Sequence, residues 1–202
     1  RTIAHTLARA IGIAERDDVT VIVPITVNPV VTVPPAVVTT GTSTYVVGSG
    51  PIKLLSGAVI TDPDSTKLIS ATVSLTNGRS GDLLTYTAPP GNPVTAQWNA
   101  TTKILTLSGS ATLAQYEAAL KAITFSTTQG GVPRIASITV KDDSGLQSLV
   151  AGVASVIVVA VPPLLVVAPL AVGTAGSAIR VSPVVAITDV DSQKLSSATV
   201  TI

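Results

Sequence analysis

Residues Ile60–Leu75 read ITDPDSTKLISATVSL, and residues Ile187–Ile202 read ITDVDSQKLSSATVTI. Eleven of these sixteen positions are identical, at a constant offset of 127 residues. Upstream, Val33-Pro34-Pro35 returns as Val161-Pro162-Pro163 at an offset of 128 residues, so the repetition extends beyond one segment. Solenoid repeats have periods of roughly 20–50 residues, so a period this long indicates that a whole domain is repeated.

The repeat predicts three parts along the chain. Residues 36–161 form one complete module, and residues 162–202 form a linker and the start of a second, incomplete module. Residues 1–35 are expected to hold an N-terminal helix followed by a strand and linker. Because Arg16-Asp17-Asp18 parallels Lys141-Asp142-Asp143, and each precedes an apolar stretch and Val-Pro-Pro, this part is interpreted as the tail of a preceding repeat.

Inside the module the apolar residues recur with a period of two. Ile69, Ala71, Val73 and Leu75 alternate with Ser and Thr, which is typical of a strand with one buried face. In the second copy, Ala198, Val200 and Ile202 are expected to face inward. Six further strands are predicted, separated by turn residues, at Leu83–Thr87, Val94–Trp98, Lys103–Leu107, Ala122–Ser126, Ile135–Val140 and Leu149–Val159. Short strands at this spacing predict an all-β, antiparallel β-sandwich.

One helix is expected among the strands, near residues 112–122. Thr112 and Gln115 have the spacing of a capping box, in which each residue satisfies a backbone N–H of the other. Leu113, Tyr116 and Leu120 follow at helical spacing, so their apolar stripe should pack over one end of the sandwich.

Composition excludes several classes of protein. The chain has no cysteine, which rules out disulfides and thiolate metal sites. The net charge of +1 removes the electrostatic basis for nucleic-acid binding. Aromatic residues make up only 2%, so the core must be built from Val, Ile, Leu and Ala. A module of this length can bury such a core without help from disulfides.

The uncharged stretch from Ser144 to Ile179 is long enough to span a bilayer. Pro162, Pro163 and Pro169 would interrupt a helix there, and the run Val156–Val159 favours a strand. We therefore interpret the stretch as an apolar strand, a Pro-Pro linker and another apolar strand, and expect no membrane span.

The sequence offers no constellation for catalysis. His5 is the single histidine, so a Ser-His-Asp triad or a His-containing metal site would depend on it. It lies in residues 1–14, where the spacing of Ile3, Leu7 and Ile11 fits either a short amphipathic helix or a frayed terminus. No Gly-rich nucleotide-binding loop is present. We expect that the protein is not an enzyme.

Paired aspartates are the one set of residues with potential ligand chemistry. Eight of the eleven acidic residues fall in four pairs, namely Asp17/Asp18, Asp62/Asp64, Asp142/Asp143 and Asp189/Asp191. Clustered carboxylates in loops suit calcium, so Asp62, Asp64, Asp142 and Asp143 are candidate calcium ligands if they converge at one end of the sandwich. The alternative is ordinary turn chemistry, because Asp-Pro-Asp-Ser and Asp-Ser-Gly are typical turn sequences. No other cofactor is expected.

Three segments carry a resemblance to a known family. They are the TDPDS turn at 61–65 with its following strand, Trp98 before Lys103–Gly109, and Thr139–Gly145. Together they resemble bacterial cadherin-like and immunoglobulin-like tandem repeats, above all the dystroglycan-type cadherin-like module. The helix region Ala111–Phe125 is similar to a variant found in large bacterial surface proteins. The resemblance implies an Ig/cadherin-like sandwich in tandem repeat.

The resemblance further implies a stalk or adhesin repeat, located outside the cell or on its surface, with calcium binding as an open alternative. The linker Val161-Pro162-Pro163 departs from the animal pattern, because it lacks the acidic residues that coordinate calcium between domains. Proline stiffening is an alternative there. The partners implied are neighbouring repeats of the same chain or identical subunits, with a surface protein or glycan as a further alternative.

The incomplete second module leaves a second functional alternative open. Residues 164–202 supply about three strands, too few to enclose a core, so Ala198, Val200 and Ile202 would face water. One interpretation is that the chain is truncated. Alternatively, the chain is a subunit of an extracellular filament in which residues 1–35 of a neighbour, through the apolar strand Val19–Val27, complete the half-module by strand addition.

Overall fold

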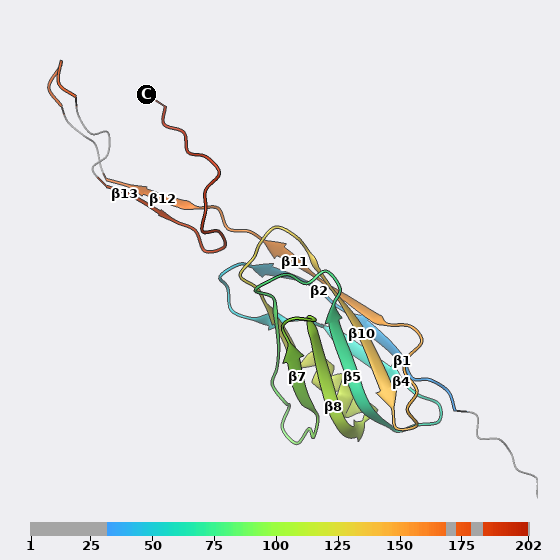
Figure 1. Cartoon of the computed structure of the whole chain (residues 1–202). Coiled ribbons are helices and arrows are strands. Elements are labelled where there is room, and N and C mark those ends of the chain that lie inside the picture. The colour runs from blue at the N-terminus through green and yellow to red at the C-terminus, as the bar shows by residue number, and fades with distance from the viewer. Residues whose placement is uncertain (1–31, 169–172, 179–183, 202) are drawn as a thin grey trace, which may run out of the picture. The chain divides into compact units, whose positions relative to one another are not determined.

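The computed structural model describes residues 32–168, 173–178 and 184–201 (Figure 1). Contacts divide the chain into residues 1–31 and residues 32–202. The expected helix and strand of the N-terminal segment, with His5 and Asp17/Asp18, therefore lie outside the described residues. The described part is an all-β, sandwich-like fold with a single short helix, as the sequence predicts.

The strands and the helix occur in an order that matches most of the predicted segments. The first half comprises β1 (Ala36–Thr40), β2 (Thr42–Val46), β3 (Ile52–Lys53), β4 (Gly57–Thr61), β5 (Lys67–Leu75), β6 (Leu83–Tyr86) and β7 (Thr95–Asn99). The second half comprises β8 (Ile104–Thr112), α2 (Leu113–Lys121), β9 (Ile123–Ser126), β10 (Arg134–Asp142), β11 (Gly152–Val159), β12 (Leu164–Val167) and β13 (Val185–Thr188).

The sandwich is built on a six-stranded sheet in the order β2-β11-β10-β5-β8-β7. A three-stranded sheet, β3-β9-β6, and the pair β1-β4 form separate sheets. The pairings between described strands are antiparallel, as predicted, with the exception of β2 and β11, which are parallel. Strands β2 and β11 come from opposite ends of the module and lie side by side in Figure 1.

The core lies between these sheets and is mainly aliphatic. Inward residues of β5, β8, β10 and β11 face β9, β6, β1, β4 and α2 in one continuous cluster. Two aromatic rings join the two sides, because Tyr45 of β2 meets Phe125 of β9 edge-on at a centroid distance of 5.6 Å. Such T-shaped pairs are favourable beyond the area they bury.

The predicted inward face of β5 is right at three positions and wrong at one. Ala71, Val73 and Leu75 are buried, but Ile69 is 36% exposed and Leu68 is fully buried in its place. The reason is a register shift of β5 against β8 between Leu68 and Ser70. A bulge of this kind adds one residue to a strand and reverses the phase of the side chains beyond it.

The helix prediction is confirmed. The Thr112 hydroxyl accepts a hydrogen bond from the Gln115 backbone, and the Gln115 side chain accepts one from the Thr112 backbone, which completes the capping box. Tyr116 and Leu120 are buried, and Leu113 packs against the core. Glu117 forms a further contact between the helix and β4 that the sequence pattern did not predict. Its Oε1 accepts a hydrogen bond of 2.8 Å from Ile60 N.

The apolar stretch around the Pro-Pro linker forms strands, as predicted. Strand β11 ends at Val159, the linker follows, and β12 begins at Leu164. Among the described residues, no helix is long and apolar enough to cross a membrane. The strand predicted by the alternation in the second copy is not formed, because residues 196–201 are not in a strand. Val200 is 77% exposed. Among the described residues, the second copy therefore has two strands, β12 and β13, rather than about three.

The second copy repeats a strand pairing of the first. Ala36 pairs with Thr61 where β1 meets β4, and Leu164 pairs with Thr188 where β12 meets β13. These partners are displaced by 128 and 127 residues, which are the two offsets of the sequence repeat. The tandem repetition of complete modules stays a prediction.

Candidate functional site

The loop between β4 and β5 is organised by its first aspartate. Asp62 Oδ1 accepts hydrogen bonds from the backbone N–H groups of Asp64 and Ser65, at 3.2 and 3.0 Å. The Ser65 hydroxyl lies 2.8 Å from the Lys67 carbonyl and accepts from the Lys67 N–H at 3.2 Å. Turns are stabilised in this way when an aspartate or serine side chain forms a hydrogen bond with the backbone two residues further along the chain.

The second copy of this loop is built by the same hydrogen bonds. Asp189 Oδ1 accepts from the N–H groups of Asp191 and Ser192, at 3.0 and 3.1 Å. The Ser192 hydroxyl lies 2.8 Å from the carbonyl of Lys194. Val190 stands where the first copy has Pro63, so the shape of the loop does not depend on proline.

The second aspartate of each loop binds the linker that precedes its module. Val33 N donates to Asp64 Oδ2 at 3.0 Å, and Val161 N donates to Asp191 Oδ2 at 2.9 Å. Both valines begin a Val-Pro-Pro segment. We call this hydrogen bond the linker contact. A carboxylate acceptor makes it stronger than a bond between neutral groups.

The four predicted calcium ligands lie at one end of the sandwich. The Ser65 hydroxyl lies 2.5 Å from Asp143 Oδ1, which brings the β10–β11 turn against the loop of Asp62 and Asp64. A hydroxyl carries one proton, so Ser65 donates either to Asp143 or to the Lys67 carbonyl at any moment. The predicted convergence of the two acidic pairs is therefore present.

Asp142 is the buried member of this end. Its Oδ1 accepts from the Ser144 hydroxyl at 2.7 Å and from the Leu146 N–H at 2.8 Å, and its Oδ2 has no partner. Burial acts to raise the pKa of Asp142, but the hydrogen bonds of Ser144, Leu146 and Gly145 outweigh it, so the pKa is lowered. The carboxylate is thus held ionised by the turn itself.

The two equivalent aspartates of the repeated loop differ in their pKa. Burial raises the pKa of Asp62, and the negative charge of Asp64 adds to this effect, although backbone hydrogen bonds oppose it. Hydrogen bonds from Asp191 lower the pKa of Asp189 despite some burial. The backbone hydrogen bonds are the same in the two copies, so the difference reflects the burial of Asp62 and the opposite effects of the second aspartate, which raises the pKa of Asp62 and lowers that of Asp189.

Metal binding by these residues stays a prediction. Within residues 32–168, 173–178 and 184–201, no group of three or more His, Asp or Glu side chains is arranged to hold a metal ion. The carboxylates of Asp62, Asp64, Asp142 and Asp143 instead accept the backbone and hydroxyl hydrogen bonds described above. What the arrangement does is shape two turns and attach a linker.

The sequence analysis missed a buried ion pair between Arg134 and Asp82. Both side chains are fully buried, and Arg134 also bonds to the carbonyls of Val132 and Gln129. A signal was present, because Arg134 falls in phase with Ala136 and the other inward residues of β10. A charge on a buried face requires a partner of opposite charge.

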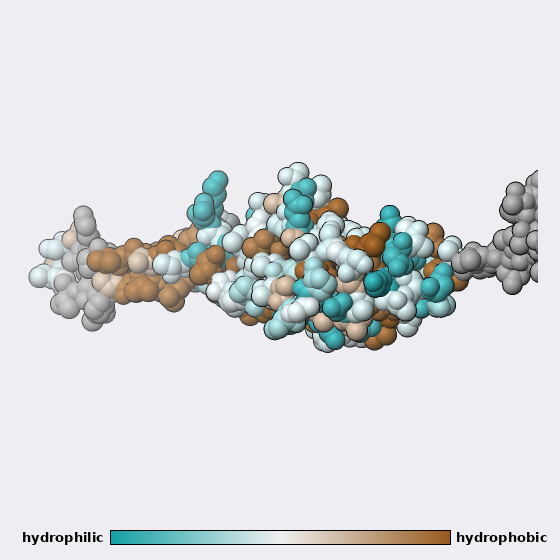
Figure 2. All heavy atoms as spheres, turned by 90° about the horizontal axis from the view of Figure 1, so that it is seen from below, coloured by the Kyte–Doolittle hydropathy of each residue, from teal (hydrophilic) through white to brown (hydrophobic). Residues whose placement is uncertain are grey.

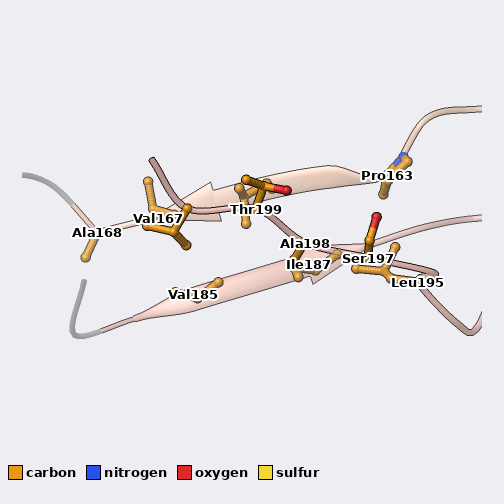
Figure 3. Close-up of a pocket in the computed structure, with 11 residues that line it drawn as sticks. Pro163, Val167, Ala168, Val185, Ile187, Leu195, Ser197, Ala198 and Thr199 are labelled. Carbon is orange, nitrogen blue, oxygen red and sulfur yellow. The ribbon is translucent and has the colours of Figure 1, made fainter. Parts of the chain in front are cut away.

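The second copy also presents an apolar groove of about 740 Å³ (Figure 3). Figure 2 shows hydrophobic surface gathered on this segment, whereas the sandwich in that view is mixed. The groove is lined by Pro163, Leu165, Val167, Ala168, Val185, Ile187, Leu195, Ser197, Ala198, Thr199 and Val200. Leu165 and Ile187 are 59% and 44% exposed, but their equivalents Val37 and Ile60 are buried in the complete module.

Comparison with known proteins adds no family to this description. No family model matches the chain, and no curated protein or solved structure matches it significantly. The class of the protein therefore rests on its own features, an all-β sandwich with a repeated loop that holds a repeated linker.

Proposed function

We propose that this chain is a section of an extracellular structural repeat protein, in which each module serves as a spacer in a stalk or adhesin. The observation that carries the proposal is the linker contact, made by Asp64 in one copy and by Asp191 in the next. A loop that holds the preceding linker positions one module against another, which is what a spacer requires. The role involves no catalysis.

One row across the outer face of β7, β8, β5 and β10 is polar and suits contact with water. Gln97, Thr106, Thr72 and Thr139 lie opposite one another across β7, β8, β5 and β10. Rows of uncharged hydroxyl and amide groups keep a sheet face wet without creating an apolar patch. Such a face suits a module whose neighbours are attached at its ends.

Surface labelling of the source cells tests this proposal. An antibody raised against the purified chain should label intact cells, and mild protease treatment of those cells should remove the label. A cytoplasmic protein of the same cells serves as the control and should be labelled only after permeabilisation. Labelling that requires permeabilisation would refute the extracellular role.

The apolar groove favours a second candidate, a subunit of an extracellular filament. Leu165, Val185 and Ile187 expose a contiguous apolar face, and such faces commonly mark interaction sites. In this alternative, residues 19–27 of a neighbouring subunit add a strand to the half-module. Light scattering should then show assembly of the intact chain, and deletion of residues 1–35 should abolish it. A monomeric intact chain excludes this alternative.

A further inference from the structure

We propose that the parallel pair β2–β11 bears mechanical load, so that the module resists being pulled apart from its two ends. The inference rests on the proposed function, because a spacer transmits tension between the linkers that flank it. It names the element that would carry the tension and the way in which that element would fail.

The direction of the two strands is the first argument. Thr42–Val46 pairs in parallel with Ser155–Val159, in a continuous register. Strand β2 lies close to the N-terminal linker along the chain, and β11 ends just before the C-terminal linker. Tension applied through the linkers pulls two parallel strands in opposite directions along their length. The pair is therefore sheared, and its hydrogen bonds are loaded together rather than one after another.

Further hydrogen bonds extend the pair at both ends. Ser155 N donates to the Gly41 carbonyl at 3.0 Å, and Val47 N donates to the Val159 carbonyl at 3.1 Å. The Thr39 hydroxyl adds a bond of 2.9 Å to the Val153 carbonyl. The attachment of the N-terminal segment to β11 thus extends from Thr39 to Val47.

Burial on one side protects these bonds from water. Tyr45 and Val47 on the N-terminal side, with Val156 and Val158 of β11, point into the core and are at most 5% exposed. Backbone hydrogen bonds are stronger where water is excluded. Breaking the pair also exposes these side chains, so rupture requires the loss of packing as well as of hydrogen bonds.

The antiparallel pair β1–β4 does not relieve the load. If β1 leaves β4, the tension passes across Gly41 directly to β2. The neighbouring strand β10 then anchors β11 through the pairs from Arg134 to Ile138. The pair β2–β11 is therefore the last connection between the two ends of the module, and shear must break it before the module unfolds.

Single-molecule force spectroscopy on the whole chain tests this inference. The chain has no cysteine, so two introduced cysteines define where the force acts. A variant with Thr32→Cys and Ala160→Cys pulls the module in shear. A variant with Gln129→Cys and Ala160→Cys pulls from one end only, because Gly130 lies against Ala160. Force in that geometry peels β11 from its neighbouring strands, beginning at Val159 and breaking one residue pair at a time.

We expect the unfolding force in shear to be at least about twofold higher than in peeling at the same loading rate, because the hydrogen bonds share the load. Ser155→Pro, which removes the N–H donated to Gly41, should lower the force in shear, and Ser155→Ala, which keeps it, should not. Equal forces in the two geometries, or a shear force unchanged by Ser155→Pro, would overturn the inference. The comparison of shear with peeling uses protein whose strands are all wild type, so it does not depend on whether Ser155→Pro folds. The unfolding forces are also independent of the cell-surface labelling. A failure of the mechanical inference can therefore be distinguished from a failure of the proposed extracellular function.

Discussion

The guanidinium of Arg134 is fully buried against the carboxylate of Asp82, with Arg134 Nε 2.6 Å from Asp82 Oδ2. The same carboxylate oxygen accepts the N–H of Arg79 at 2.6 Å. One carboxylate thereby joins the turn after β5 to the start of β10. In a core that is mainly aliphatic, this pair fixes the two loops at one end of the module.

Asp82→Ala should therefore destabilise the module strongly. It leaves the Arg134 charge buried and unpaired, which typically costs about 3–5 kcal/mol. Urea unfolding of the chain measures the loss. The double variant Asp82→Leu, Arg134→Met should lose much less, because replacing a buried ion pair with apolar residues is often close to neutral. A single variant as stable as the wild type would contradict the structural role of this pair.

The acidic end of the sandwich predicts opposite pH effects at two aspartates. The pKa of Asp142 is lowered from its ordinary value of 3.8, so its contribution to stability is present above that value and is lost as the pH falls through the folded pKa. The pKa of Asp62 is raised, so its contribution is greatest in acid and declines as the pH rises through its folded pKa.

Urea unfolding between pH 7 and pH 3 separates these two contributions. Asp142→Asn should flatten the loss of stability in acid, and Asp62→Asn should steepen it. Each variant is the control for the other, since both remove one charge from the same end of the module. The account of the two environments fails if both substitutions change the slope in the same direction.

The linker contact predicts a selective effect on amide hydrogen exchange. Asp64→Ala removes the acceptor of the Val33 N–H, so exchange at Val33 should accelerate, on the order of fivefold or more, while the Ser65 amide stays bound to Asp62. Asp62→Ala should have the reverse pattern. Asp191→Ala should accelerate exchange at Val161 in the second copy. If the two amides respond alike to both substitutions, the loop and the linker are not held separately.

Calcium should leave the melting temperature unchanged, because no group of three or more acidic side chains among the described residues is arranged to hold a metal ion. Thermal unfolding in excess calcium and in chelator measures this, with magnesium as the control for ionic strength. A ligand that binds the folded state raises stability in proportion to the logarithm of its concentration. A saturable rise with calcium alone, lost in Asp142→Asn, would support the calcium-binding alternative.

Much of the fold could be predicted because local signals agree with it. The capping box of Thr112 and Gln115 determined where the helix begins, and alternation and turn residues located β5 to β11, whereas β2, β3 and β4 were not predicted. The bulge at Leu68 could not be predicted, since alternation alone does not show where an extra residue enters a strand. The parallel pairing of β2 and β11 was also missed, because a periodic pattern carries no information on the direction of a distant partner.

The candidate site was predicted in part. The repeat indicated which aspartates matter, because both carboxylates persist where Pro63 becomes Val190. Their partners could not be predicted, since the bond between Val33 and Asp64 spans 31 residues and depends on how the linker returns to the loop. The partnership of Arg134 and Asp82 spans 52 residues and depends in the same way on the folded loops.

The central claim, that one module plan begins again after the linker, is tested most directly by completing the second copy. In this experiment, residues 76–161 are appended after Ile202, the equivalent of Leu75, and the same segment in scrambled order serves as the control. We predict that the completed copy folds, so that the groove around Leu165 and Val200 becomes buried and the calorimetric unfolding enthalpy rises to about twice that of the original chain. An enthalpy equal to that of the scrambled control, with Val200 still exposed, would contradict the claim.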